Sequence, residues 1–417
     1  MDRVRPVIAG WDAVSPLGLD WQEQWKRALA GESGIGPLTR FQLPDDFPVR
    51  IAGEVDLRDI EPCPPFLRPR EMVHWTSPIF RYGMLVVDRA LSRAGITIGP
   101  ELAPRVGITF STAIGGLDAV VDAYVAMAKS GSLPMPSVNP NSCVNMITGK
   151  ISMLTGATGP AVTTIAACAT GCASMAVGAM MIQAGMADVV IAGAVDFPLV
   201  EPIVAGFASM NGAFKHKPEA VGETPQRASR PFSVDRRGFV ISEGAGCILL
   251  CHPDFARAHG LTADFELAGW AMNSDAHHPV APHRPTIARC IAGAIEHAGI
   301  RPQAVQAVNA HATSTRIGDK TEADALHDVF GASVPPVSAN KSQIGHAMGA
   351  SSVLESLLAI EGMRHDTVLG TNNYTPDPEV ILDSVTPDAR HVTQEYVLKN
   401  AFGFGGMNTC VVFRRLQ

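Results

Sequence analysis

Short apolar runs alternate with helical patterns along the whole chain, and this alternation limits the possible folds more than any other feature. The runs with the length of buried strands are Val106–Phe110, Ala161–Ala167, Asp188–Ala194, Ala245–Leu250, Ala307–Ala310, Pro336–Ala339 and Thr409–Phe413. The segments with helical patterns are Ile79–Ala94, Ala169–Ala184, Ile287–Ala298, Lys320–Phe330 and Ala350–Met363. Strands that are apolar throughout need cover on both faces, so the pattern predicts an α/β fold whose sheet lies between helices.

The chain also carries an ordered internal repeat. Ile8–Trp11 (IAGW) recurs as Leu267–Trp270 (LAGW), and the predicted strand, turn and helix around Cys168 are echoed by Pro336–Lys341 and the helix after it. Two echoes in the same order indicate two similar α/β halves, and we expect the functional site where they meet. The predicted halves are residues 1–253 and 254–417.

Composition and charge exclude several classes of partner. Apolar residues make up 46% of the 417 residues and charged residues 18%, which is enough for a large buried core. The net charge of −7 argues against nucleic acid as a partner. Three polar residues, Gln183, Asp188 and Asp196, interrupt the longest apolar stretch, so we expect no membrane span.

Two further features bear on the setting of the protein. The N-terminus has no hydrophobic signal segment, and the eight cysteines lack the spacing of a disulfide or metal framework. We therefore expect reduced thiols, a cytoplasmic protein and no metal. The polar segment Phe214–Ser229 contains two prolines and is predicted to be a surface loop.

Cys168 lies where an apolar run meets a helix pattern of small residues. A thiol at a helix N-terminus faces unpaired backbone N–H groups and the positive end of the helix dipole, and both favour the reactive thiolate. Such N–H groups also stabilise oxyanions. Position alone leaves two interpretations open, a nucleophile and an inert core thiol.

Other candidate residues follow predicted strands in the second half. His311 follows Ala307–Ala310, and His346 follows Pro336–Ala339 with Lys341 five residues before it. The carboxyl ends of strands are where α/β folds gather reactive groups, although a single histidine is more often structural. Asn400–Asn408 holds three glycines, and it is either a turn entering the last strand or a loop that lines a pocket, with Phe404 as a movable wall.

Together these motifs resemble the β-ketoacyl-ACP synthases of the I/II type, the condensing enzymes of fatty acid and type II polyketide synthesis. The resemblance spans nearly the whole chain and rests on Ala167–Gly171, Arg230–Phe232, Asp235–Phe239, Ala310–Thr315, Gly318 and Asp319 with Glu322, Lys341 with Gly345 and His346, and Phe402–Gly406. It implies a thiolase fold, in which two similar α/β halves form a layered αβαβα architecture. It also implies a Cys–His–His site for decarboxylative Claisen condensation.

The resemblance assigns roles to individual residues. Cys168 would carry the acyl chain as a thioester, while His311 and His346 would donate hydrogen bonds to the malonyl thioester oxygen as its enolate forms. Lys341 would orient the site, with Glu322 as its structural partner. The remaining implied residues are the backbone N–H groups of Cys168 and Phe404 as the oxyanion hole, Phe404 as the gate, Thr313 and Thr315 for phosphopantetheine, and Ile114 and Phe207 in the acyl pocket.

The resemblance also implies partners. The phosphopantetheine arm arrives on an acyl carrier protein, so no metal or resident organic cofactor is expected. The acyl and malonyl thioesters are the substrates. A homodimer is implied, and a heterodimer with a second type of subunit remains open.

The chain departs from the family pattern at three places. Ala312 stands where Gly is usual, and it would be costly if that position needs a positive φ. Met407 stands where Thr is usual and would narrow the site behind Phe404. Of the two basic clusters by which the family commonly docks its carrier, Arg68 and Arg70 match one loosely, whereas residues 131–136 contain no basic side chain.

Three alternative functions remain. An acyltransferase that does not decarboxylate malonate would need Cys168 and only one of the histidines. A thiolase would need a second cysteine in the glycine-rich loop, and Cys410 lies just beyond that loop. A non-catalytic partner subunit would lack the nucleophile. The presence of Cys168, His311 and His346 together favours the condensing enzyme.

Overall fold

The computed structural model describes residues 4–57, 60, 63–210, 212–215, 224–382 and 384–416. Within these residues a nine-stranded sheet has the order β4-β5-β6-β1-β7-β13-β12-β8-β9. Its strands are β1 (Val7–Val14), β4 (Val106–Ile108), β5 (Val189–Asp196), β6 (Gly244–Cys251), β7 (Phe265–Ser274), β8 (Ala307–Asn309), β9 (Val337–Ser338), β12 (Tyr396–Gly403) and β13 (Met407–Arg415). Two small sheets pair β2 (Ile35–Pro37) with β3 (Ile51–Gly53), and β10 (Thr367–Val368) with β11 (Arg390–His391).

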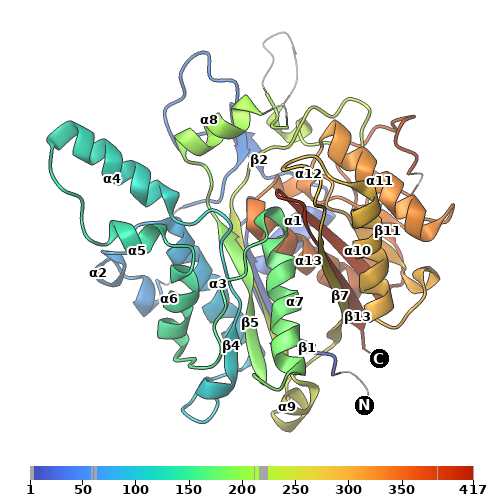
Figure 1. Ribbon diagram of the computed structural model, residues 1–417, viewed down its shortest axis with the longest axis horizontal. Coiled ribbons are helices and arrows are strands. Elements are labelled where there is room, and N and C mark those ends of the chain that lie inside the picture. The colour runs from blue at the N-terminus through green and yellow to red at the C-terminus, as the bar shows by residue number, and fades with distance from the viewer. Residues whose placement is uncertain are drawn as a thin grey trace.

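Helices cover the sheet and connect its strands (Figure 1). The α-helices are α1 (Trp21–Leu29), α2 (Pro69–Met72), α3 (Pro78–Ala94), α4 (Leu117–Ser130), α5 (Val138–Ser142), α6 (Met146–Thr155), α7 (Thr170–Gln183), α8 (Glu201–Ser209), α9 (Pro253–Ala258), α10 (Arg284–His297), α11 (Arg316–Phe330), α12 (Lys341–Ile344) and α13 (Met348–Arg364). Short 3₁₀ turns are η1 (Pro65–Leu67), η2 (Ala103–Arg105), η3 (Ala167–Ala169), η4 (Pro225–Arg227) and η5 (Pro302–Ala304). No helix among the described residues combines the length and apolar character needed to cross a lipid bilayer.

The sheet repeats its topology on the two sides of the contact between β1 and β7. On one side β4 runs parallel to β5, while β5, β6 and β1 pair antiparallel. On the other side β8 runs parallel to β12, while β12, β13 and β7 pair antiparallel. β1 and β7 themselves share only two antiparallel residue pairs. The IAGW and LAGW segments therefore occupy equivalent strands, while the boundary between residues 253 and 254 stays a prediction.

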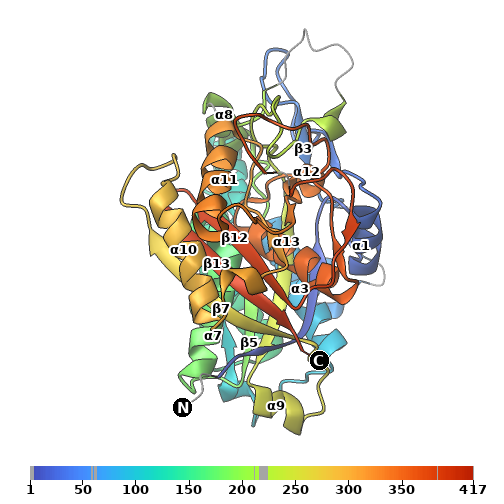
Figure 2. The same cartoon turned by 90° about the vertical axis from the view of Figure 1, so that its right-hand side faces the viewer.

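The core consists of three apolar layers, because successive side chains of a strand point to opposite faces. Along β12, Val397 and Ala401 face a central core, whereas Leu398 and Phe402 face an outer core. Two helices, α7 and α13, lie in the central layer and are buried on nearly all sides. The outer layers are formed by α3 against β1 and β6, and by α10 against β7 and β13 (Figures 1 and 2).

Most predicted elements are present, and one predicted strand is wrong. The five predicted helices occur as α3, α7, α10, α11 and α13, with ends shifted by up to four residues. The run Ala161–Ala167 forms only a single bridge, between Ala161 and Ile108 of β4, and then turns into η3. Val162 and Ile165 are about two-fifths exposed there, so this run lies along the outer edge of the sheet with no strand beyond it in the described residues.

Three long strands were not predicted as strands. The sequence analysis recognised β1 and β7 only as the two copies of a repeat. It missed β12 because the glycine-rich segment at the end of that strand interrupts its apolar pattern. Residues 400–403 complete β12, and β13 begins at Met407, so the predicted loop is the turn of a β-hairpin. Most of the predicted surface loop Phe214–Ser229, residues 216–223, lies outside the described residues.

Candidate active site

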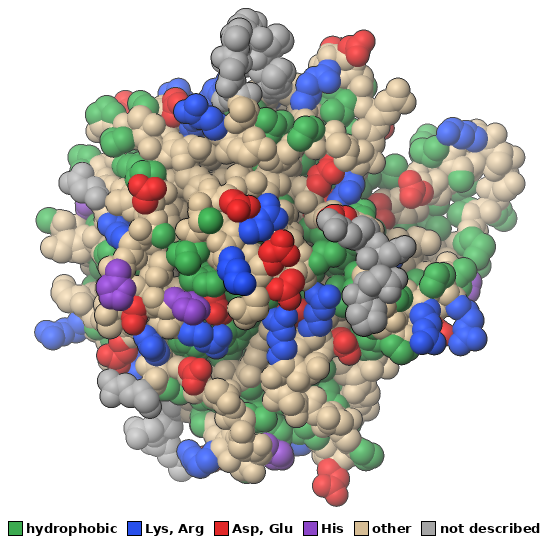
Figure 3. Space-filling view, turned by 180° about the vertical axis from the view of Figure 1, so that it is seen from behind, with side chains coloured by type: hydrophobic (Ala, Val, Ile, Leu, Met, Phe, Trp, Pro, Cys, Tyr) green, Lys and Arg blue, Asp and Glu red, His purple; other side chains and the backbone are tan. Residues whose placement is uncertain are grey.

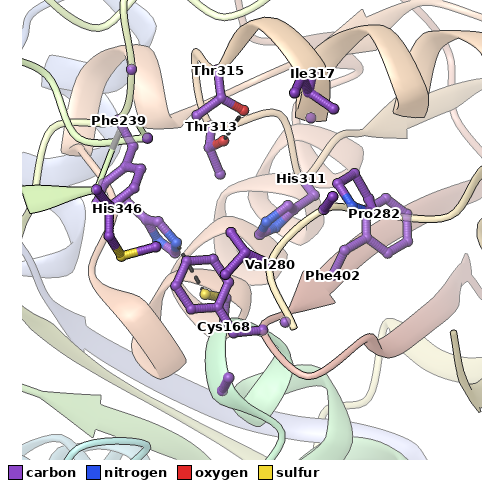
Figure 4. Close-up of a pocket in the computed structure, with 18 of the residues that line it drawn as sticks. Cys168, Phe239, Val280, Pro282, His311, Thr313, Thr315, Ile317, His346 and Phe402 are labelled. Atoms are coloured by element: carbon purple, nitrogen blue, oxygen red, sulfur yellow. Dashed lines mark hydrogen bonds between the residues drawn. The ribbon is translucent and has the colours of Figure 1, made fainter. Parts of the chain in front are cut away.

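A cavity of about 950 Å³ is lined by segments from both predicted halves of the chain. The first half contributes Cys168, Ile114 and Phe207, and the second contributes His311 and His346. Figure 4 shows the cysteine and the two imidazole rings turned toward one another in this cavity. The structure thus brings together residues that are up to 232 positions apart, from Ile114 to His346.

Cys168 lies in η3, immediately before α7, and its side chain is buried. The turn places Ala167 at φ 47°, in the left-handed region that a residue with a Cβ rarely adopts. Burial raises the pKa of the Cys168 thiol to about 11, although Lys341 and the backbone N–H groups of Phe404 and Cys168 act to lower it. Desolvation therefore outweighs the helix end, so Cys168 rests as the thiol and not as the thiolate that the helix end alone favours.

His346 is the direct partner of that thiol. Its Nε2 lies 3.2 Å from Cys168 Sγ, and its Nδ1 lies 2.9 Å from Ser351 Oγ. Burial and the charges of Lys341 and Lys399 hold the pKa of His346 well below its usual 6.5, so the ring is neutral. A neutral ring whose Nδ1–H donates to Ser351 leaves Nε2 free to accept the thiol proton.

His311 is the second imidazole, and its ring centroid lies 5.8 Å from that of His346 at an interplanar angle of 85°. Burial, Lys341 and the neighbouring His346 hold its pKa well below the usual 6.5. Its Nδ1 is buried and has no hydrogen-bond partner among the described residues. The neutral tautomer that carries its proton on Nε2 avoids placing an unpaired N–H in that buried position.

Four hydrogen bonds fix the backbone around His311. Glu322 accepts from the N–H groups of His311 and Ala312 at 2.9 and 2.7 Å. Lys341 donates to the His311 carbonyl at 2.7 Å, and Lys399 donates to the preceding carbonyl, that of Ala310, at 3.1 Å. The imidazole is therefore positioned by its own peptide groups rather than by a side-chain partner.

The predicted pairing of Lys341 with Glu322 is wrong. Lys341 pairs with Glu355, whose Oε1 lies 2.6 Å from Nζ, and both side chains are at most 1% exposed. Glu322 instead bonds to backbone N–H groups and to Asn400, because α11 places it on the outer side of β12 whereas α13 places Glu355 on the inner side. The sequence analysis missed Glu355 and Lys399, although a charged residue inside an apolar helix or strand pattern is a recognisable signal.

Phe404 and the two threonines line the cavity. Phe404 occupies the β12–β13 turn. A Cβ at the preceding residue, Gly403, would overlap the carbonyl oxygen of Ala166, which lies two residues before Cys168 in the chain. Thr313 and Thr315 line the cavity and their hydroxyl oxygens are 3.1 Å apart (Figure 4). At the apolar end, Phe207 packs edge-to-face on Phe239, with ring centroids 5.6 Å apart.

The departures from the family pattern have less effect on the cavity than expected. Ala312 does not have a positive φ, since the left-handed residue of that loop is Ser314 at φ 70°. Met407 is 38% exposed and does not line the cavity, because successive side chains of β13 point to opposite faces and the next one, Asn408, points into it. Cys410 is buried in the outer core and does not line the cavity either.

Basic residues to which the sequence analysis gave no role lie at the cavity. Lys215, Arg237 and Arg316 all line it, and neither Lys215 nor Arg316 forms an ion pair in the described part of the chain. The predicted basic residues behave differently, since Arg70 pairs with its neighbour Glu71 at 3.1 Å.

Comparison with known proteins agrees with this geometry. Residues 4–256 match the family model for the N-terminal domain of beta-ketoacyl synthases, and residues 265–375 match the model for the C-terminal domain. The 3-oxoacyl-[acyl-carrier-protein] synthase 2 of Coxiella burnetii is 34% identical over 422 residues, which cover 100% of both chains. The enzyme of the same name from Staphylococcus aureus strain MRSA252 is 32% identical and covers 99% of both chains.

Solved structures show the same fold. A beta-ketoacyl synthase from Burkholderia phymatum has a TM-score of 0.89 and 29% identity, over 99% of this chain and 100% of that one. A ketosynthase in complex with its type II polyketide acyl-carrier protein has a TM-score of 0.89 and 25% identity, over 100% of both chains. The ishigamide ketosynthase/chain length factor has a TM-score of 0.88 and 27% identity, also over 100% of both. The predicted thiolase fold is confirmed, and the chain belongs to the beta-ketoacyl synthase family of condensing acyltransferases.

Proposed function

We propose that this enzyme joins an acyl group held on Cys168 to the two-carbon unit of a malonyl thioester, with loss of CO2. The observation that carries the proposal is the contact of 3.2 Å between Cys168 Sγ and His346 Nε2, with a second neutral imidazole beside it in one cavity. A hydrolase would need a strong base to activate water, whereas two neutral donors suit a reaction driven by decarboxylation.

In the first step Cys168 attacks the carbonyl carbon of the acyl thioester, and its proton passes to His346 Nε2. The N–H groups of Cys168 and Phe404, which both reach the sulfur, stabilise the tetrahedral oxyanion. The intermediate collapses when the carbon–sulfur bond to the donor breaks. The departing thiolate then takes the proton from His346, which returns to its neutral form.

In the second step the malonyl thioester loses CO2, and the electron pair of the broken bond forms an enolate at the thioester oxygen. His311 and His346 donate hydrogen bonds from Nε2 to that oxygen, each worth about 3 kcal/mol to the transition state. For His346 this requires the proton to move from Nδ1 to Nε2. Ser351 allows this, since its hydroxyl either accepts from Nδ1 or donates to it at 2.9 Å. The enolate carbon then attacks the acyl carbonyl, and Cys168 leaves as the thiolate.

We propose that both thioesters arrive on the phosphopantetheine arm of an acyl carrier protein, past Thr313 and Thr315. Support comes from the relatives named as acyl-carrier-protein synthases and from the solved complex with a carrier. Lys215, Arg237 and Arg316 supply the positive charge for the phosphate or for an acidic carrier, in place of the missing cluster at 131–136. On the face seen in Figure 3, basic and acidic side chains are interspersed. We place the reaction in the cytoplasm because all eight cysteines are free thiols.

A second copy of the chain is the proposed partner of helix α4. This helix stands away from the body of the molecule, and only Ala119 among its residues is buried (Figure 1). Tyr124 is 71% exposed, and Leu133, just after the helix, is 89% exposed. An apolar surface of this kind usually marks an interface. A subunit like the chain length factor of the ishigamide protein would fit the same surface. Native mass spectrometry distinguishes a homodimer from such a heterodimer by the mass of the complex.

The test is intact-protein mass spectrometry after the enzyme is mixed with acyl and malonyl carrier proteins. We expect an acyl adduct on Cys168 and a β-ketoacyl carrier two carbons longer than the primer. Cys168→Ala should form neither, whereas Cys172→Ala, the matched control four residues further on, should form both. An adduct that persists in Cys168→Ala would overturn the proposal.

A further inference from the structure

The centre of β12 contains a second buried lysine that the steps above do not use. Lys399 is 0% exposed, in a strand whose other buried residues, except Asn400, are mostly apolar. Its Nζ donates to Glu355 Oε2 at 2.8 Å and to the carbonyl groups of Asn400 and Ala310 at 2.8 and 3.1 Å. All three possible donor positions of the ammonium group are therefore occupied.

Lys399 and Lys341 share one carboxylate. Glu355 accepts from Lys341 through Oε1 at 2.6 Å and from Lys399 through Oε2 at 2.8 Å, and all three side chains are at most 1% exposed. Within this hydrogen-bonded cluster, two ammonium groups and one carboxylate leave one positive charge in excess, while the next carboxylate, that of Glu322, bonds to Asn400 instead. Burying such an excess costs free energy, and an uncharged side chain at this strand position would avoid that cost.

The excess charge lies directly behind the two histidines. Lys399 and Lys341 bond to consecutive carbonyl groups, those of Ala310 and His311. After burial and Lys341, Lys399 is one of the causes that lower the pKa of both His311 and His346. The titratable groups that act on the two rings or on their neighbours Cys168 and Lys341 are Cys168 (η3), Asp196 (β5), Glu322 (α11), Lys341 (α12), Glu355 (α13) and Lys399 (β12).

We propose that Lys399 is a positioning residue of the condensation, one that makes the buried charge behind the histidines positive. That charge keeps His346 unprotonated and able to accept the Cys168 proton, and it favours the negative charge of the enolate in the same cavity. The proposal rests on the proposed function, because it concerns the acylation and decarboxylation steps.

The test measures acylation of Cys168 by an acyl carrier protein from pH 5 to pH 9, with mass spectrometry of the adduct as the readout. Lys399→Met removes the charge and leaves a neutral Lys341–Glu355 pair. We expect the acid limb of the profile to move upward by about one pH unit. Malonyl decarboxylation at pH 7 should fall about tenfold. Lys399→Arg retains the charge and should keep the acid limb at the wild-type pH.

Val397→Ala is the matched control, because Val397 is buried on the same face of β12 but carries no charge. It should lower the unfolding temperature without moving the acid limb. A Lys399→Met enzyme whose profile superimposes on that of the wild type would overturn the proposal. If the Met variant does not fold, Lys399→Gln, which retains an amide donor, is measured instead. If neither uncharged variant folds, the role of Lys399 is structural and the proposal is wrong. Wild-type enzyme that forms no acyl adduct would instead contradict the proposed function, before any variant is compared.

Discussion

Removing the carboxylate of Glu355 should destabilise the protein far more than removing either lysine. Glu355→Gln keeps the shape of the side chain and leaves two ammonium groups buried 2.6 and 2.8 Å from a neutral amide. Breaking a buried pair by deleting one partner costs about 3–5 kcal/mol. Here one deletion strands two charges, so we expect a loss of about 4 kcal/mol or more at pH 7. Since domains are stable by about 5–15 kcal/mol, this is a large fraction of the total.

The pH dependence of that loss has a definite sign. Burial lowers the pKa of Lys341 from its usual 10.5, while Glu355 acts to raise it. In Glu355→Gln the raising contribution is gone, so the folded-state pKa falls further below the unfolded value. A base with a depressed pKa destabilises the fold at low pH, and the cost disappears as the pH rises through the folded and unfolded pKa values. The variant should therefore recover stability between pH 7 and pH 10.

Urea unfolding at pH 7 and pH 9, followed by circular dichroism, measures both effects. Glu361→Gln is the matched control, since Glu361 is also buried on α13 but its ionisable partners, Arg364 and His365, are 39% and 49% exposed, and a glutamine oxygen can still accept from Trp21 Nε1. It should cost only about 1 kcal/mol. The reasoning is refuted if Glu355→Gln unfolds within about 1 kcal/mol of the wild type at pH 7, or if it becomes less stable at pH 9.

Three further predictions concern the cavity. Alkylation of Cys168 by iodoacetamide should be slow at pH 7, and its rate should rise about tenfold per pH unit up to pH 9, because the pKa of the thiol is raised to about 11. A rate that reaches a plateau below pH 8 would show a resting thiolate instead. Arg316→Ala should raise KM for the acyl carrier protein several-fold and leave KM for an acyl-N-acetylcysteamine unchanged, because only the carrier brings phosphate and acidic groups. Equal effects on the KM of both substrates would exclude a role of Arg316 in carrier docking. Ile114→Phe should lower the length of the longest acyl chain that acylates the enzyme, because Ile114 lines the cavity. The limit is measured with a series of primers of increasing length, and an unchanged limit would place the acyl chain elsewhere.

The sequence predicted the fold class and the cluster of Cys168, His311 and His346 because both rest on local patterns. Apolar runs and helical periodicity identified β4, β5, β6, α7 and α13, and short motifs identified the nucleophile and the histidines. Strand β12 was missed because Lys399 and the glycines after it interrupt its apolar pattern. The edge run at 161–167 was predicted as a strand because composition does not reveal whether a neighbouring strand is present.

The electrostatics of the site depend on contacts between distant segments, which local patterns do not contain. Whether Lys341 pairs with Glu322 or with Glu355 depends on which face of β12 each helix covers. The charge state of Cys168 depends on how completely the surrounding layers bury it, and a helix end read from sequence carries no measure of that burial.

The central claim is that one turnover consumes the acyl group on Cys168 and one malonyl group together. It is tested most directly in a single turnover, in which acyl-enzyme is mixed with malonyl carrier protein and quenched at successive times. Three amounts are measured, namely acyl group remaining on Cys168, CO2 released and β-ketoacyl product formed. The account predicts that acyl loss, CO2 release and product formation are equal in amount. Loss of the acyl group to a carrier thiol without CO2 release would contradict it and identify the protein as an acyltransferase that does not condense.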